Sequence, residues 1–241
     1  MKRIIFICTA IVLFTGLLSQ RAEAQQPTIA NQLQSLGETQ IAAGLKEALA
    51  RGVTNAIANL NKQGGFLTNL NVKIGLPPSL ATTEKTLRKL KQDYLVDGFI
   101  TNMNRAAEIA VGEAGPIFGE AIRAMTVADA EAILHGPKDA ATRYFQKVSE
   151  ARLQEKMLPI IQDATGKAGA TASYKALMEK SKLSSFFNFG KSPFDLDSYI
   201  NAKTTEGLFK MIADEEKRIR ENPTARATDL LQKVFGKISI P

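Results

Sequence analysis

Most residues that could carry chemistry lie on one predicted helix, residues 93–113. Along one side, at helical spacing, this segment carries polar and charged residues: Asp97, Thr101, Asn104, Arg105 and Glu108. Two residues of later predicted helices, Asp129 and Thr142, could face them. The guanidinium of arginine is a planar fork that suits anionic and amide groups. We therefore predict a set of four ligand-binding residues: Asn104, Arg105, Glu108 and Asp129.

Two alternatives stay open for the same residues. Carboxylates such as Glu108 and Asp129 could act as acid and base, which would make the protein a carboxylate-dependent hydrolase. The other alternative is structural, because Arg105 and Glu108 stand three residues apart on one helix. Buried charges in helical cores are paired and hydrogen-bonded, so this pair could belong to the core.

Other catalytic chemistry finds little support in the residue types. The single histidine, His135, precedes Gly136-Pro137, where a helix is expected to end, so a helix-capping role is favoured over a catalytic one. The single cysteine, Cys8, lies in the N-terminal leader, which leaves no thiolate for metal binding or nucleophilic attack. Phosphate-loop, dinucleotide-binding and Gly-x-Ser-x-Gly motifs are absent from the sequence. We assign no catalytic residue, no metal and no cofactor.

Two further segments could contact a surface. Residues 184–194 hold four phenylalanines, which would mark a membrane or partner contact if exposed, or a lid over the core if buried. A basic run comprises Lys85, Arg88, Lys89 and Lys91. Its ordinary interpretation is a solvated helix face, and the alternative is contact with an anionic surface.

The N-terminus predicts export. Lys2 and Arg3 precede an apolar run over residues 4–18, and residues 22–24 form a small-x-small cleavage site. We predict a signal peptide over residues 1–24 and one helical domain over residues 25–241, in the periplasm or secreted. No later stretch is long and apolar enough to span a bilayer. The net charge of +7 suits anionic lipids or cell-wall polymers, and nucleic acid is not an expected partner.

Hydrophobic periodicity predicts an all-α fold of about eight helices. A lead-in at 28–36 comes first, and the predicted helices lie near residues 41–60, 79–91, 93–113, 117–125, 126–135, 139–162, 171–183, 195–220 and 223–236. Thr126 with Asp129 resembles a capping box. Residues 72–76 and 237–240 alternate apolar and polar residues with the period of a strand. We therefore predict one small two-stranded β-ribbon that pairs these segments.

Several short stretches form a combined pattern over nearly the whole chain: residues 44–49, 103–108, 116–118, 121–122, 125–126, 129–130, 140–142, 144–145, 207–209, 215–216, 219–220, 223, 228–229 and 234–236. In this combination the chain resembles a bacterial family of exported helical proteins, domain-of-unknown-function family number 4197. The resemblance implies export and a helical fold. It implies no activity.

These observations favour an exported, non-enzymatic helical protein that binds a hydrophobic or anionic ligand or an envelope partner. The carboxylate-dependent hydrolase is one alternative, and a purely structural interaction protein is another. A concave site with convergent polar groups would separate the first two from the third.

Overall fold

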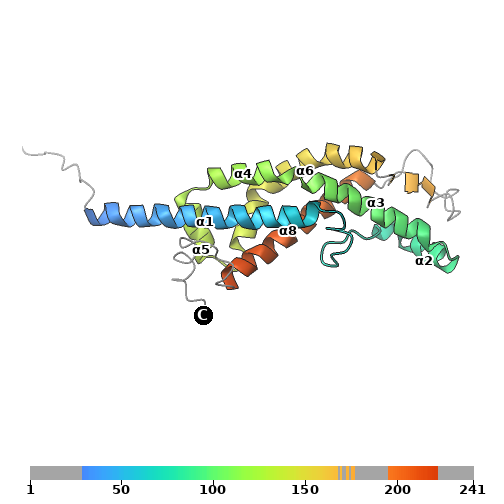
Figure 1. Cartoon of the computed structure of the whole chain (residues 1–241), viewed down its shortest axis with the longest axis horizontal. Helices are drawn as coiled ribbons and strands as arrows, with labels where there is room; N and C mark the ends of the chain where they lie inside the picture. Colours follow the sequence, from blue (N-terminus) through green and yellow to red (C-terminus); the bar gives the residue numbers. More distant parts are fainter. Residues whose placement is uncertain (1–28, 168, 170–171, 174, 177–194, 222–241) are drawn as a thin grey trace, which may run out of the picture. The chain divides into compact units, whose positions relative to one another are not determined.

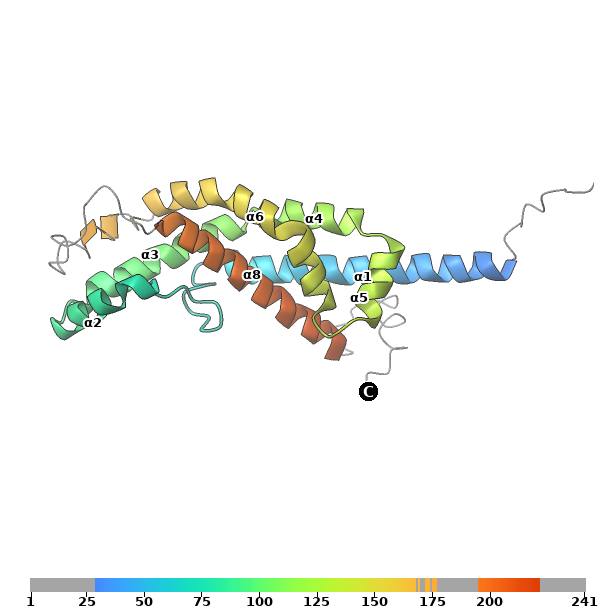
Figure 2. The same cartoon turned by 180° about the vertical axis from the view of Figure 1, so that it is seen from behind.

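The computed structural model describes residues 29–167, 169, 172–173, 175–176 and 195–221, with side chains from residue 37 on. In these residues it contains seven α-helices and one 3-10 turn (Figures 1 and 2). They are α1 (Ile29–Asn61), η1 (Pro78–Leu80), α2 (Ala81–Lys89), α3 (Asp93–Val111), α4 (Ala114–Ala124), α5 (Val127–His135), α6 (Ala140–Lys167) and α8 (Leu196–Glu221). The predicted all-helical fold is confirmed for this part of the chain.

The chain divides into two units, residues 1–37 and 38–241, and the division falls inside α1. In the first unit, the described residues are the opening turns of α1. All contacts discussed below belong to the second unit. The predicted lead-in helix and the helix after it are one continuous helix, α1.

Several predicted elements lie outside the described residues: most of the helix at 171–183, the helix at 223–236, the segment 237–240 and the Phe-rich segment 184–194. The predicted count of about eight helices is therefore not confirmed. One predicted boundary moves. Helix α4 begins at Ala114, so Gly115 and Pro116 lie inside its first turn instead of before it. A proline is tolerated there because first-turn N–H groups have no partner within the helix.

The strand predicted at residues 72–76 is wrong, and the described residues contain no strand. This segment is irregular chain that leads into η1. Its alternating pattern is nevertheless real in one respect, because Val72 and Ile74 are buried and Lys73 and Gly75 are exposed. The hydrogen bonds that a neighbouring strand would supply come from a side chain of α3, as described below.

Helix α6 is the centre of the described core. It packs against α8, α3, α4 and α5, and α3 also packs against α8 (Figures 1 and 2). One stripe of α6 recurs every three or four residues and is buried along its whole length: Phe145, Ser149, Leu153, Met157, Ile161 and Ala164. This spacing keeps the stripe on one side of the helix, toward its partners.

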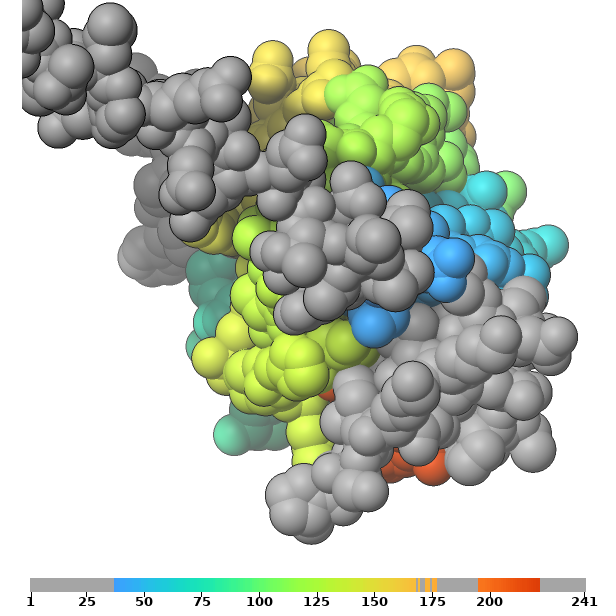
Figure 3. Space-filling view, turned by 90° about the vertical axis from the view of Figure 1, so that its left-hand side faces the viewer, coloured from blue at the N-terminus to red at the C-terminus, as the bar shows by residue number. Residues whose placement is uncertain are grey.

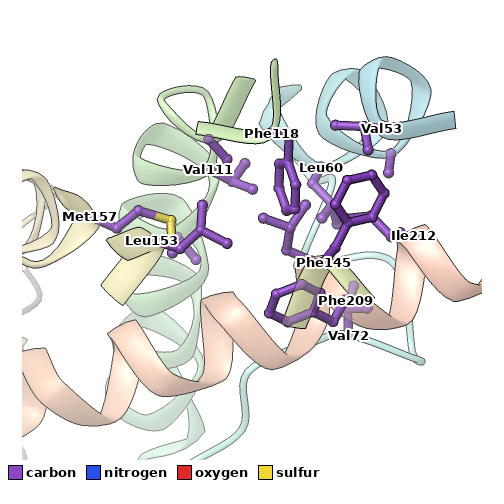
Figure 4. Packing of buried hydrophobic residues seen from close by; sticks show 14 of the residues in the cluster. Val53, Leu60, Val72, Val111, Phe118, Phe145, Leu153, Met157, Phe209 and Ile212 are labelled. Atoms are coloured by element: carbon purple, nitrogen blue, oxygen red, sulfur yellow. The ribbon is translucent and has the colours of Figure 1, made fainter. Parts of the chain in front are cut away.

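Three phenylalanines from three helices meet in the core (Figure 4). Phe118 of α4 lies edge-on to Phe145 of α6, with ring centroids 5.2 Å apart, and to Phe209 of α8, at 6.1 Å. Edge-to-face pairs contribute about 0.5–1.5 kcal/mol beyond the apolar area that they bury. The cluster therefore joins α4, α6 and α8 in a fixed geometry.

The chain between α1 and η1, residues 62–77, folds back onto this core and is called the 62–77 loop. Gly64 has φ +79°, a conformation that favours glycine. Phe66 is fully buried against Gly207 of α8. A Cβ on Gly207 would stand 2.8 Å from Phe66 Cε1, so only glycine lets the ring approach this closely.

Candidate functional site

Asn104, one of the predicted ligand residues, is fully buried and binds the backbone of the 62–77 loop. Its Oδ1 accepts a hydrogen bond from Ile74 N–H at 2.8 Å, and its Nδ2 donates to Ile74 O at 2.8 Å. Nδ2 also donates to Ile100 O at 2.7 Å. A neighbouring strand would offer Ile74 one donor and one acceptor, and the side-chain amide of Asn104 supplies both.

Glu108 holds a second point of the same loop. Its Oε1 accepts from Phe66 N–H at 3.3 Å, and its Oε2 accepts from Arg105 Nη1 at 3.2 Å. Glu108 is 2% exposed, whereas the side chain of Arg105 is 46% exposed. The ion pair of the structural alternative is therefore present. We call Asn104 and Glu108 the loop clamp.

Thr142 does not face the clamp, because it belongs to another buried cluster. Its N–H and Oγ1 donate to Glu216 Oε2 at 2.9 and 2.8 Å, and Ala141 N–H donates to Glu216 Oε1 at 3.0 Å. Glu216 thereby caps the first turn of α6 from α8.

Arg220 completes this cluster one turn further along α8. It donates from Nε and Nη2 to Glu216 Oε1, and Nη2 also reaches Ile133 O at 2.9 Å, near the end of α5. We call these contacts of Glu216 and Arg220 the α5–α6 junction. The adjacent cavity is only about 10 Å³, room for one water at most. The junction is therefore a structural element and not a ligand pocket.

Asp129 stands apart from the three predicted residues on α3. The predicted capping box is confirmed: Asp129 N–H donates to Thr126 Oγ1, and Thr126 N–H donates back to Asp129 Oδ2. The Thr126 hydroxyl also donates to Oδ2 at 2.7 Å. These bonds hold the pKa of Asp129 below its usual value.

Asp129 also lines an open groove of about 460 Å³ between α4, α5 and α6. Figure 3 shows parts of α4, α5 and α6 in a space-filling view. We call this the α4–α6 groove, and its lining residues are Ile117, Glu120, Ala121, Ala124, Asp129, Tyr144, Lys147, Val148 and Arg152. None of the three predicted residues on α3 is among them.

The floor of the groove is apolar and its rim is charged. Val148 is 45% exposed and contributes apolar surface to the groove. Arg152 pairs with Glu120 across the groove and lowers the pKa of that carboxyl. The Tyr144 hydroxyl donates to Ala121 O at 3.2 Å, and burial raises the pKa of this phenol.

Lys147 is the cation of the groove that forms no ion pair with any described residue. Among the described residues no group of three or more His, Cys, Asp or Glu side chains is placed to hold a metal ion. His135 is the last residue of α5 and is exposed. Within the described chain, no helix is both long enough and apolar enough to cross a bilayer.

Comparison with known families gives one result. The model of a protein family of unknown function, DUF4197, matches residues 35–236, which is most of the chain. The protein is a member of the DUF4197 family. No curated protein and no solved structure matches the chain significantly. The loop clamp, the α5–α6 junction and the α4–α6 groove of this DUF4197 protein all lie inside the matched region.

Sequence reasoning missed the groove and the junction. The groove has no motif, because its lining comes from three helices and is mostly small or aliphatic. The junction did leave a signal, since Glu216 is in phase with buried Ile212 and Ile219 on the apolar stripe of α8. A carboxylate in that phase predicts a buried, hydrogen-bonded charge.

Proposed function

We propose that this protein is an exported, non-enzymatic binding protein whose α4–α6 groove takes a ligand with an apolar body and one negatively charged group. The observation that carries the proposal is the groove itself. Its volume falls within the range of small-molecule sites, and it combines an apolar floor with a few polar groups.

The preference for a negative group follows from the charges on the rim. Arg152 and Glu120 form an ion pair, and Asp129, which accepts hydrogen bonds from Thr126, keeps its negative charge and interacts electrostatically with Lys147. Lys147 is left without an ion pair among the described residues. An anionic head group beside Lys147 would gain a charge-assisted contact, whereas a cationic one would meet repulsion.

The hydrolase alternative has weaker support. Both oxygens of Glu108 accept hydrogen bonds inside the fold, and the Asp129 carboxylate accepts hydrogen bonds from Thr126. The groove that Asp129 lines does not include Glu108. A general acid and base must reach one substrate together, so this arrangement favours binding over hydrolysis.

The proposal is tested by calorimetric titration with decyl sulfate below its micellar concentration, and with decyltrimethylammonium as the cationic counterpart. We expect binding of the sulfate and about tenfold weaker binding of it by Lys147→Glu. Lys156→Glu is the matched control, because Lys156 is an exposed lysine of the same helix outside the groove. Equal affinity of the two variants, or equal binding of both amphiphiles, would contradict the proposal.

Export is tested separately. The motivation is the positive, apolar and small-residue pattern of residues 1–24. We expect the protein recovered from the periplasm or medium of its host to begin at Gln25. Recovery in the cytoplasm with residues 1–24 intact would contradict the proposal. Native mass spectrometry of the exported protein would then reveal the mass of any ligand retained.

A further inference from the structure

The turn between α2 and α3 exposes two large side chains that a soluble helical hairpin would ordinarily bury. Leu90, the residue after α2, is 58% exposed, and Tyr94, in the first turn of α3, is 68% exposed. The hairpin itself is well anchored, because Leu87, Val96 and Phe99 are fully buried. The exposure is therefore local to the turn between α2 and α3, whose backbone is seen in Figures 1 and 2.

The turn is also fixed by its own hydrogen bonds. Lys91 N–H donates to Arg88 O and Gln92 N–H donates to Leu87 O, the two bonds of a Schellman motif. Lys91 occupies the left-handed position of this motif with φ +56°, where glycine is preferred. Lys91 therefore places a long cationic side chain at the apex of the turn, in a backbone conformation that disfavours residues with a side chain.

The charges around the turn are separated by sign. Arg88 forms ion pairs with three acidic residues of the hairpin, Glu84, Asp93 and Asp97, at 3.0, 3.1 and 3.0 Å. Lys85 and Lys89 stand four residues apart on the outward side of α2, opposite buried Thr83 and Leu87.

The lysines themselves are left without acidic partners. None of Lys85, Lys89 and Lys91 forms an ion pair with a described residue. A surface with exposed apolar residues and unpaired lysines results. We call it the docking tip, and it consists of Lys85, Lys89, Leu90, Lys91 and Tyr94.

We propose that the docking tip attaches this protein to the surface of an anionic lipid bilayer. Lysines near an anionic leaflet are attracted to lipid phosphates, each strengthening binding about fivefold. Leucine and tyrosine beside them can enter the interface, where tyrosine is enriched because its ring is amphipathic. A soluble polyanion would use the lysines alone, so Leu90 and Tyr94 favour the bilayer. The inference is independent of the α4–α6 groove.

The chain contains no tryptophan, so one substitution creates a unique fluorescent reporter. Tyr94→Trp should show a blue-shifted emission when vesicles of equal parts phosphatidylglycerol and phosphatidylcholine are added, and no shift with phosphatidylcholine alone. Ile109→Trp is the matched control. Ile109 is 40% exposed on the same helix, about 22 Å further along at 1.5 Å per residue. No shift for Tyr94→Trp, or equal shifts for both reporters, would overturn the proposal.

Co-sedimentation of the full chain with the same vesicles separates the two parts of the docking tip. Lys85→Glu with Lys89→Glu should weaken binding about 25-fold or more, and Leu90→Ser with Tyr94→Ser about tenfold. Ile109→Ser and Lys156→Glu should bind as the unchanged protein does. If the lysine changes abolish binding and the Leu90 and Tyr94 changes do not, the tip binds by charge alone, as a soluble polyanion would be bound, and the proposal that Leu90 and Tyr94 enter the bilayer is overturned. Circular dichroism verifies that each variant keeps its helical content.

Discussion

The buried polar clusters and the α4–α6 groove use the same residue types for different ends. In the loop clamp and the α5–α6 junction, carboxylate and amide groups are enclosed and bond backbone groups of other elements. In the groove, charged residues are exposed, and Lys147 forms no ion pair with a described residue. Buried polar groups with complete hydrogen bonding specify the fold, whereas exposed groups around an apolar floor remain free to bind.

The largest expected effect is the loss of stability on Glu216→Ala, which removes the central carboxylate of the α5–α6 junction. The change removes the buried carboxylate that accepts hydrogen bonds from Arg220 and from the first turn of α6. We expect the free energy of unfolding to fall by about 3–5 kcal/mol in urea titrations followed by circular dichroism. Asp214→Ala, at an exposed position of the same helix, should stay within about 0.5 kcal/mol. Similar losses for both would contradict the structural role of the junction.

Asn104→Ala tests the loop clamp. The change leaves Ile74 N–H and Ile74 O buried without a partner, at about 1–3 kcal/mol for each group. Urea unfolding should therefore show a loss of about 3 kcal/mol. The control is Thr101→Ala, since Thr101 is an exposed residue of α3 bonded to its own helix. A variant of full stability that had lost ligand binding would instead make Asn104 a ligand residue.

Gly207→Ala tests how tightly the 62–77 loop packs against α8. The added methyl would overlap the ring of Phe66, and such overpacking costs about 1–3 kcal/mol. Gly98→Ala is the opposite case, because nothing lies within 4 Å of its Cβ position. That change should increase the free energy of unfolding by about 0.5–1 kcal/mol, because glycine loses more conformational freedom on folding than alanine does. The midpoint of thermal unfolding should rise accordingly. Stabilisation by both changes would show that the contact with Phe66 is loose.

Asp129 lines the groove and also bonds to Thr126 at the start of α5, and its substitution should have the smallest effect. Asp129→Ala removes the carboxylate half of the capping box of α5 and leaves Thr126 as the N-cap, at a cost of about 1 kcal/mol. The hydrogen bonds from Thr126 lower the pKa of Asp129 in the folded state. Its contribution is therefore complete above the unfolded pKa and is lost as pH falls through the lower folded value. In urea unfolding at decreasing pH, the difference in the free energy of unfolding between Asp129→Ala and the unchanged protein should shrink. A constant difference would contradict this cause.

The sequence predicted the local signals well. The capping box at Thr126, the ends of α3 and α5 and the all-helical class follow from spacing and capping residues alone. These features depend on neighbours along the chain, which a sequence displays directly.

The errors arose where a distant group decides the structure. Residues 72–76 have the pattern of a strand, yet the N–H and C=O groups of Ile74 bond the side chain of Asn104, thirty residues away. Asn104 and Glu108 were grouped with exposed Asp97 and Thr101 as one polar side, although they lie on the buried side of α3. The α4–α6 groove needs three helices at once, so no single segment indicates it.

The α5–α6 junction also bears on the order in which this protein can fold. The last carbonyls of α5 and the first N–H groups of α6 receive their partners from Glu216 and Arg220, close to the end of the described chain. A chain that has emerged only to residue 210 contains both helices and neither partner. The turn between them can reach its final state only after α8 is complete. The hydrogen bonding at the start of α6 and near the end of α5 is therefore completed by the last described helix of the chain.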